Sequence, residues 1–427
     1  MEKRRLLRQY SWKMIKVTQI QYSPESGARS ALRLQKALVN NGIQSSIVSL
    51  QKGNSSIPNA RYLGKKQKLL ARIDEKLQGW LLKNSVKKFG LFSYPIFGSD
   101  VSGLPELKEA DFIYIHWALS GFLNLKSIDQ IAKLNKPVII VLHDMWNITG
   151  GCHYSFDCEK YKSGCNNCQV FPGEKEKDLS YKEFNKKVKL YSKYTNFYFV
   201  SPSKWLYNCA KESVLAKDKP IFYIPNILDN TLFKPFDKKA AKKILNIDES
   251  ETVVAFGAVS VNSPYKGWSY LQKGLEVLKQ DDSYKNISIL IFGSIHNQEM
   301  ADAIPFKTKF MGFLYDEYST MLVYNAADVF VVPSIADNQP TTVQESLSCG
   351  TPVVGFNVGG IPDMIKHKEN GYLAAYKNSE DLAAGIKYCL YNKTKGYLLP
   401  EFEPEVTVQK HKDLYTRIKA GNIYNRI

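Results

Sequence analysis

The sequence predicts an α/β protein that contains two parallel sheets with crossover helices. Short β-rich apolar runs alternate with segments of helical period along most of the 427 residues. At about 150 residues per domain, this length favours two or three domains over one. The hydrophobic fraction of 44% is typical of a chain that buries real cores, which excludes a disordered or fibrous protein.

The first alternating series fills residues 1–222, which we assign to a first domain. It contains a helix over 28–40, which the pair Asn41 and Gly42 is expected to end. The strands expected in this series are 15–21, 46–50, 112–116, 138–142 and 197–201.

A second series fills residues 223–400, which we assign to a second domain. The junction lies near Pro225 and Asn226, and a helical stretch at 238–245 follows it. The strands expected here are 252–256, 287–292, 329–332 and 352–356. Residues 401–427 follow a break between prolines, and the helix expected there can return to pack on the first domain.

The chain lacks the sequence signals of membrane insertion and export. Its longest strongly apolar run, 138–142, has the length of a strand, whereas a membrane span needs about 20 apolar residues. The charged segment 2–8 resembles the start of a secretory signal, but polar residues interrupt the stretch that should become apolar. We therefore expect a cytoplasmic protein.

The most informative stretch joins two strands of the second series. A polar loop containing Asp337 leads into a helix that is expected to begin near Thr341 and Thr342. Free backbone N–H groups at such a helix start can bind a phosphate or pyrophosphate, and Glu345, one turn further on, can accept hydrogen bonds from a ribose diol. Spacing alone gives equal support to a simpler interpretation, in which Thr341 caps the helix and Glu345 is solvated.

These residues resemble the nucleotide-sugar site of the retaining family-4 glycosyltransferases. The family pattern is Glu, seven residues, Glu; here Asp337 stands at the first acid and Glu345 at the second. The segments VGGIPD (358–363) and ENGY (369–372) are similar to the same family. The resemblance implies a GT-B architecture, in which two Rossmann-like domains face each other across a cleft.

The resemblance also implies roles for individual residues of the second domain. Glu345 would bind the ribose of the donor, and the amides of Thr341 and Thr342 would meet its diphosphate. Asp337 would contact the sugar ring, and its shorter side chain could change the reach or the sugar preference.

Lys266 follows the first strand of the second series. A cation there can neutralise charge that develops on a departing nucleoside diphosphate; the alternative is one more surface lysine. In the resembled family an arginine also binds the phosphates, and Ala258 stands at its usual place. Lys266 would then need a second cation from elsewhere, for which Lys204 is a weak candidate.

His143 and Asp144 follow the strand 138–142 and are expected to point into the cleft. His143 could bind a substrate hydroxyl or transfer a proton, although a lone histidine is more often structural. The pair resembles the first-domain site of the same family, which implies that His143 touches the transferred sugar near its C6 hydroxyl and acts by positioning and electrostatics. Gly27 could allow a phosphate or acceptor to approach the backbone closely; Ser26 replaces a second glycine usual in the family.

Four cysteines are separated by five, six and two residues: Cys152, Cys158, Cys165 and Cys168. Four thiolates at such spacing could hold a structural Zn²⁺ that stabilises the loop. Free thiols or a redox pair are the alternatives. A catalytic metal is not expected, because four protein ligands would leave no open position.

Part of the net charge of +17 comes from residues 61–90, which contain nine Lys or Arg residues and two acidic residues. Apolar residues recur there at helical spacing: Leu69, Leu70, Ile73, Leu77, Trp80 and Leu81. This pattern is typical either of a helix on anionic lipid, with Trp80 at the interface, or of a core-facing helix with a solvated basic surface. A nucleic-acid partner is not expected, because no recognition motif accompanies the charge.

The resemblance covers most of residues 15–395 and implies a function. It predicts a hexosyltransferase that moves a sugar from a nucleoside-diphosphate donor to a glycan or lipid-linked acceptor with retention, without a catalytic cofactor. The Gly-Gly-Cys cluster after His-Asp is similar to that of bacterial enzymes of colanic acid and other surface polysaccharides, which implies a role in capsule or lipopolysaccharide synthesis at the inner face of the membrane. Two alternatives remain: a GT-B epimerase, phosphorylase or hydrolase of sugar nucleotides, and a non-catalytic zinc-stabilised module that binds membranes or nucleic acid.

Overall fold

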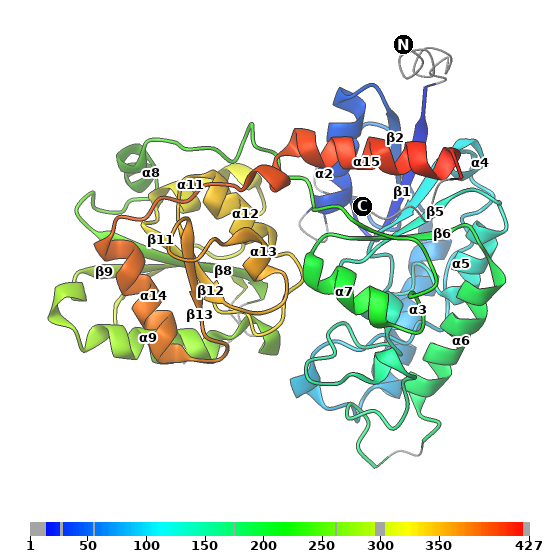
Figure 1. Cartoon of the computed structure of the whole chain (residues 1–427), viewed down its shortest axis with the longest axis horizontal. Coiled ribbons are helices and arrows are strands. Elements are labelled where there is room, and N and C mark those ends of the chain that lie inside the picture. Colours follow the sequence, from blue (N-terminus) through cyan, green and yellow to red (C-terminus); the bar gives the residue numbers. More distant parts are fainter. Residues whose placement is uncertain are drawn as a thin grey trace, which may run out of the picture.

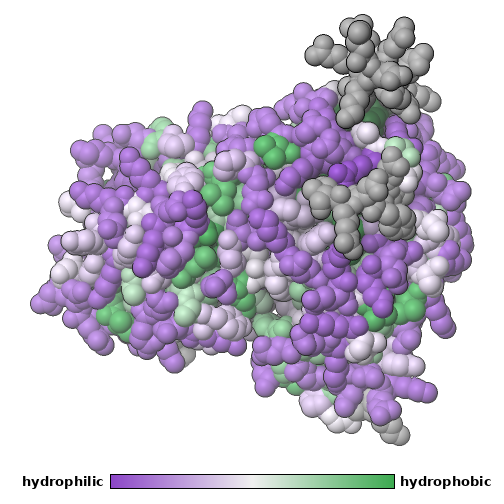
Figure 2. All heavy atoms as spheres, viewed as in Figure 1, coloured by the Kyte–Doolittle hydropathy of each residue, from purple (hydrophilic) through white to green (hydrophobic). Residues whose placement is uncertain are grey.

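The computed structural model describes residues 14–25, 29–53, 56–173, 176–260, 263–294 and 304–421. It has two lobes, each built on a parallel sheet packed between helices (Figure 1). The predicted α/β class with two parallel sheets is therefore confirmed. Hydrophilic residues cover most of the face seen in Figure 2, and hydrophobic residues form smaller patches on it. Within the described ranges, no helix is both long and apolar enough to cross a membrane.

The first lobe contains a sheet of seven parallel strands. Their spatial order is β3 (Ala60–Tyr62), β2 (Gln44–Ser49), β1 (Lys16–Gln21), β4 (Phe112–Ile115), β5 (Val138–Val141), β6 (Phe197–Ser201) and β7 (Ile221–Tyr223). Central strands such as β5 are apolar throughout because helices cover both faces of the sheet.

The second lobe contains a sheet of six parallel strands. Their order is β10 (Lys307–Phe310), β9 (Ile287–Ser294), β8 (Thr252–Ser260), β11 (Val329–Val332), β12 (Val353–Phe356) and β13 (Gly371–Ala374). In each sheet the strand order reverses once, beside β1 and β4 in the first and beside β8 and β11 in the second. Ligands of such open sheets bind beyond the carboxyl ends of the strands at this reversal.

Helices complete both lobes. Those of the first are α2 (Ser30–Asn40), α3 (Lys65–Leu81), α4 (Pro105–Glu109), α5 (Leu125–Ala132), α6 (Leu179–Lys193) and α7 (Lys204–Glu212). Those of the second are α8 (Lys238–Ile244), α9 (Trp268–Lys279), α11 (Glu317–Ala326), α12 (Thr341–Ser348), α13 (Ile361–Met364) and α14 (Ser379–Tyr391).

The last helix, α15 (Pro404–Lys419), crosses back and packs on the first lobe (Figure 1). Its apolar side chains join the core formed by α2 and one face of the first sheet. The Tyr114 hydroxyl bonds with His411 Nδ1 at 2.9 Å and with the Tyr415 hydroxyl at 3.1 Å. The core of the first lobe thus includes residues of the last described helix.

Helix α3 attaches to the first lobe through polar groups. Asp74 is completely buried, and its Oδ1 accepts hydrogen bonds from the backbone N–H groups of Ile96 and Phe97 at 2.8 and 2.7 Å. Gln78 accepts a third from Tyr94. A side chain at Gly121, where φ is +73°, would place its Cβ 2.4 Å from the Ala71 Cα, so glycine is needed for this close approach.

This arrangement leaves the apolar stripe of α3 in solvent. Leu69, Ile73, Leu77 and Trp80 are all exposed, and the buried residues of the helix are Ala71, Asp74 and Gln78. The interpretation of this stripe as core-facing is therefore wrong. The hydrophobic pattern failed here because the adjoining segment offers backbone donors that only a polar side chain can satisfy.

We predict that Asp74→Ala lowers the free energy of unfolding by about 2 kcal/mol, because it leaves two partly buried backbone N–H groups without their acceptor. Asp74→Asn is the matched control, since its amide oxygen can still accept both hydrogen bonds. Urea midpoints of the two variants measure the difference. Equal midpoints for wild type and Asp74→Ala would show that the buried carboxylate does not hold α3 in place.

Candidate active site

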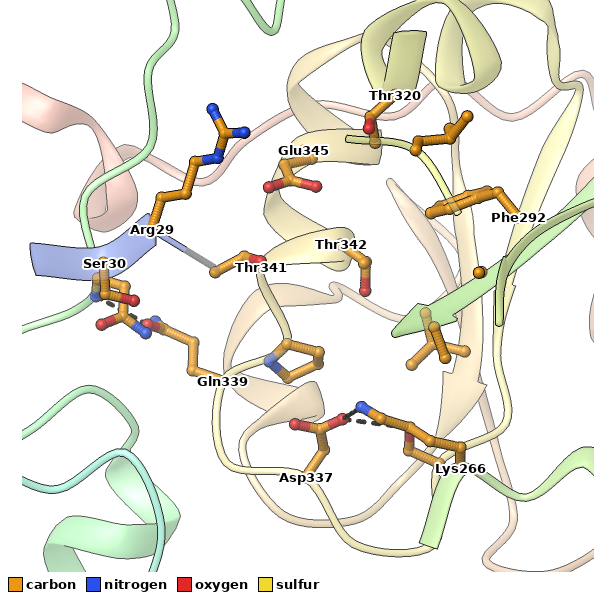
Figure 3. Close-up of a pocket in the computed structure, with 18 of the residues that line it drawn as sticks. Arg29, Ser30, Lys266, Phe292, Thr320, Asp337, Gln339, Thr341, Thr342 and Glu345 are labelled. Atoms are coloured by element: carbon orange, nitrogen blue, oxygen red, sulfur yellow. Dashed lines mark hydrogen bonds and ion pairs between the residues drawn. The ribbon is translucent and has the colours of Figure 1, made fainter. Parts of the chain in front are cut away.

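A cavity of about 830 Å³ opens between the two lobes at the carboxyl ends of both sheets. Arg29 and Ser30 approach it from the first domain, while Thr341, Thr342 and Glu345 face it from α12 (Figure 3). Segments that are far apart in the sequence thus form one chamber. This is the position that sheet topology predicts for a ligand.

The N-terminus of α12 reaches the cavity without a side-chain cap. The helix starts at Thr341 after Pro340 at the N-cap position, and no side chain in the described part of the chain caps its first turn. Thr341 is therefore not the cap that the simpler interpretation required. The first amides of α12 and the positive end of its dipole are available to an anion.

Glu345 lies one turn inside α12 and is buried, so it is not the solvated residue of that interpretation either. Its Oε1 accepts a hydrogen bond from Arg33 Nη2 at 2.7 Å, and its Oε2 accepts one from the Tyr324 hydroxyl at 2.9 Å. A carboxylate has about four acceptor positions, so two donors leave room for two more. The contacts orient Glu345 and still allow it to accept hydrogen bonds from a diol.

The contact between Arg33 and Glu345 joins the two domains across the cleft. It projects from α2 of the first domain and pairs with Glu317 at 2.8 Å as well as with Glu345. Its side chain is only 4% exposed. Burial disfavours the charged guanidinium, but Glu345 and Glu317 outweigh that effect and raise the pKa of Arg33 above its ordinary value.

Lys266 and Asp337 meet on the opposite wall of the cavity. The Lys266 Nζ lies 2.7 Å from Asp337 Oδ2, which also accepts a hydrogen bond from the Ser334 hydroxyl (Figure 3). Burial lowers the pKa of Lys266, but the carboxylate of Asp337 outweighs burial, so the pKa is raised and the amine stays charged. Glycine is required at Gly267, since a Cβ there would lie 1.8 Å from the Pro333 carbonyl oxygen.

His143 lines the same cavity and belongs to a buried chain of hydrogen bonds. Its Nε2 lies 2.9 Å from Nδ1 of His116, and the His116 Nε2 lies 2.9 Å from the Gln19 side-chain oxygen. Burial lowers the pKa of His143 to about 4 and the pKa of His116 well below its ordinary value, so both rings are neutral near pH 7.

These contacts fix the tautomer of His143. The Gln19 oxygen can only accept, so His116 Nε2 carries the proton and His116 Nδ1 is an acceptor. His143 must then donate through Nε2, which leaves its Nδ1 as an acceptor. A neutral His143 of this tautomer can accept a hydrogen bond from a sugar hydroxyl and is not an acid at neutral pH.

Asp144 points toward the cysteine loop and is not among the described residues that line the cavity. Its Oδ2 lies 2.6 Å from His153 Nδ1, and its Oδ1 accepts the N–H of Trp146 at 2.8 Å. Burial raises the pKa of Asp144, but His153 outweighs this effect and lowers it. Asp144 thus connects the cysteine loop, through His153, to the end of β5. Tyr154, which follows His153 in that loop, lines the cavity.

The structure does not support the predicted zinc. Cys152, Cys158, Cys165 and Cys168 are free thiols near one another, but no group of three or more His, Cys, Asp or Glu side chains among the described residues is arranged to hold a metal ion. Cys165 Sγ instead accepts the backbone N–H of Gly150 at 3.2 Å. Burial raises the pKa of Cys165 to about 12.

Other predicted residues lie outside the cavity or outside the described ranges. Gly27 falls between the described ranges. Lys204 pairs with Glu401 at 2.8 Å and is not a described lining residue, so it is not the second cation of this cavity. Sequence reasoning missed Arg33, which looks like an ordinary surface residue of a helix. It also missed His116, although its place at the end of a strand next to β5 was a usable signal.

The sequence of the second domain matches a known family. Residues 250–392, which contain Lys266, Asp337 and the whole of α12, match the model of the group 1 glycosyl transferases. Over 253 residues, or 57% of this chain, the sequence is 25% identical to the putative colanic acid biosynthesis glycosyl transferase WcaC of Escherichia coli. Over 169 residues it is 30% identical to the D-inositol 3-phosphate glycosyltransferase of Rhodococcus opacus. These matches span 58% and 37% of the two relatives.

Solved structures share the fold of the whole chain. Sucrose-phosphate synthase from Thermosynechococcus elongatus has a TM-score of 0.63 at 17% identity, covering 95% of this chain and all of that one (100%). Anabaena HepE, solved with UDP-glucose, has a TM-score of 0.60 at 17% identity and covers 94% of this chain and 100% of its own. The family resemblance is confirmed: the second domain matches the group 1 glycosyl transferases, the relatives are glycosyltransferases, and the whole chain shares the GT-B fold of the solved structures.

Acid should destabilise the fold through its buried histidines. Burial lowers the pKa of His143 to about 4 and that of His411 to about 3, whereas an unfolded histidine titrates near 6.5. Between these values the unfolded chain binds more protons, so stability is fully present above pH 6.5 and falls as the pH drops toward 4.

In this pH range, each of these histidines should lower the free energy of unfolding by up to about 1.4 kcal/mol for each unit by which the pH falls. Urea midpoints measured from pH 7 to pH 5 check the slope. His411→Phe should make it shallower, and an unchanged slope in that variant would contradict the assignment.

Proposed function

We propose that this protein transfers a sugar from a nucleoside-diphosphate sugar to a glycan or lipid-linked acceptor. The observation that carries the proposal is the uncapped start of α12, which opens into the interdomain cavity together with Glu345 and Lys266. These groups offer hydrogen-bond donors for a diphosphate, an acceptor for a diol and a cation for the leaving group.

In this proposal the donor lies with its diphosphate at Thr341 and Thr342. The ribose hydroxyls donate to the free positions of Glu345, whose orientation Arg33 and Tyr324 fix. Breakage of the glycosidic bond moves negative charge onto the leaving diphosphate. Helix amides and a lysine that are already in place stabilise that charge without reorganisation, which lowers the barrier.

The sugar would lie between Asp337 and His143. Asp337 can accept hydrogen bonds from sugar hydroxyls, and its negative charge stabilises an oxocarbenium-like centre. His143 would accept a hydrogen bond through Nδ1, the acceptor left by its contact with His116. No step of this mechanism needs a metal ion or cofactor. Transfer with retention follows from the resemblance to retaining enzymes and is part of the proposal.

The relatives support a nucleotide-sugar donor and a polysaccharide product. HepE was solved with UDP-glucose and also with UDP, and WcaC is described as a putative colanic acid biosynthesis enzyme. We therefore propose UDP-sugars as the first donors to test. We also propose a role in bacterial surface polysaccharide synthesis on the cytoplasmic side of the membrane.

Labelled donors distinguish transfer from the rival reactions. Thermal-shift screening of UDP-, GDP- and ADP-sugars should find one that stabilises the protein. With that donor, a labelled glycoside supports transfer, free sugar indicates a hydrolase, and an altered sugar nucleotide indicates an epimerase. The anomeric configuration of the glycoside, determined by NMR, tests retention.

Glu345→Gln should weaken donor binding by about 10- to 100-fold, because a charged acceptor for the ribose diol is lost. Glu317→Gln is the matched control: it removes an acid from the same Arg33 but leaves Glu345 in place. Calorimetry with the stabilising donor measures both variants. Equal losses would show that Glu345 merely anchors Arg33, and they would refute the ribose contact.

Lys266→Ala should weaken UDP binding by about 10-fold or more, because a charged contact to the diphosphate disappears. Asp337→Asn breaks the same ion pair but keeps the cation, so UDP affinity should be retained while sugar transfer falls. Calorimetry with UDP and a transfer assay separate the two effects. Unchanged UDP affinity in Lys266→Ala would remove the lysine from the diphosphate site.

A further inference from the structure

Helix α3 presents an apolar stripe to solvent. The side chains of Leu69, Ile73, Leu77 and Trp80 are 59%, 42%, 36% and 64% exposed. At about 100° per residue they fall on a stripe about 80° wide that runs along most of the helix. Single exposed apolar residues are common, but four in register on one helix face mark an interaction surface.

The fold enforces this exposure. The opposite face carries Asp74 and Gln78, which together accept three backbone hydrogen bonds from residues 94–97. Rotating the helix to bury the stripe would break all three hydrogen bonds and leave these backbone donors without their acceptors. The stripe is therefore a fixed feature of the surface.

Cationic side chains lie along one flank of the stripe and at both of its ends. At about 100° per residue, Lys65, Arg72 and Lys76 fall on that flank. The exposed basic residues of the helix and the segment after it are Lys65, Lys66, Arg72, Lys76, Lys83, Lys87 and Lys88, whereas Arg61 pairs with Glu106. Asp74 is buried, which leaves Glu75 as the exposed acid among residues 61–90. The surface thus combines a narrow apolar strip with a dense positive border, which we call the α3 surface.

We propose that the α3 surface binds the headgroup region of an anionic lipid bilayer. The apolar side chains would enter the acyl boundary, with Trp80 at the interface, while the cations meet lipid phosphates. A second copy of the chain fits poorly, because a two-fold interface would set the positive borders against each other. A nucleic acid would use the charge but would leave the apolar strip facing phosphates.

One end of the α3 surface lies near the rim of the cavity. Lys87 and Lys88 of this surface are followed by Gly90, which approaches the second domain, where a Cβ on it would lie 3.7 Å from Tyr265. Tyr265 itself lines the cavity. If the proposed function holds, a bilayer on the α3 surface would bring lipid-linked acceptors next to the site of transfer. The membrane contact itself does not depend on that function.

Vesicle co-sedimentation of the full chain tests the proposal. Wild type should bind phosphatidylcholine vesicles that contain phosphatidylglycerol, bind pure phosphatidylcholine far less, and lose binding as salt rises. The double variant Ile73→Ser with Trp80→Ser should bind at least about ten-fold more weakly. The matched control, Val39→Ser with Tyr391→Ser, alters hydrophobic residues elsewhere that are at least as exposed as Ile73 and Trp80, and it should bind like wild type.

Tryptophan emission gives a second readout. The difference spectrum between wild type and Trp80→Phe should shift to the blue when anionic vesicles are added, because the indole leaves water. Three results would overturn the proposal: no wild-type binding to anionic vesicles, equal loss in the stripe and control variants, or a dimer in gel filtration that the stripe variant dissolves. Donor binding is measured separately, so failure of the proposed function leaves these results unchanged.

Discussion

The ion pair between Arg33 and Glu345 joins the two domains inside the interdomain cavity, and it determines the state of the acid there. A carboxylate buried at that depth carries a large desolvation penalty, which the hydroxyl of Tyr324 alone would not offset and which the guanidinium of Arg33 does. Because Arg33 comes from the first domain and also binds Glu317, this ion pair is one of the contacts that hold the domains together, beside Asn338, which bonds with Ser203 and the Leu142 carbonyl. The acid is thus held ready for a ligand by the element that closes the cavity around it.

Sheet topology explains why much of this site could be predicted. Lys266 follows β8 and Asp337 follows β11, which are neighbouring parallel strands, so their carboxyl ends bring the two loops together although 71 positions separate them. The same reasoning applies to His143 after β5 and to Glu345 in the helix after β11. The chemical class of a residue and its place after a strand were enough to identify lining residues, while their roles remain predictions.

The features that escaped prediction depend on contacts between distant segments. Arg33 has the sequence context of any helix surface, and its partners lie 284 and 312 positions away. Strands β3, β7, β10 and β13 were missed because each is an edge strand of only three or four residues, too short to give a clear pattern. Nothing local to the cysteine cluster indicates how its sulfurs are directed. In each case the feature depends on residues that come together only when the chain folds.

Two acids show most clearly where hydrophobic pattern and charge mislead. Asp74 and Asp144 would each be expected at a surface or in a cleft, yet partners from irregular segments hold both inside. For Asp74 these are the backbone N–H groups of Ile96 and Phe97, and for Asp144 they are the His153 ring and the N–H of Trp146. A carboxylate can satisfy two or three such donors at once, which no apolar side chain can do. The opposite face of the helix then lies in solvent, and in α3 that face carries the apolar residues. Exposure of that stripe therefore follows from the hydrogen-bonding demand of residues 94–97, and any partner of the α3 surface uses a face that the fold could not bury.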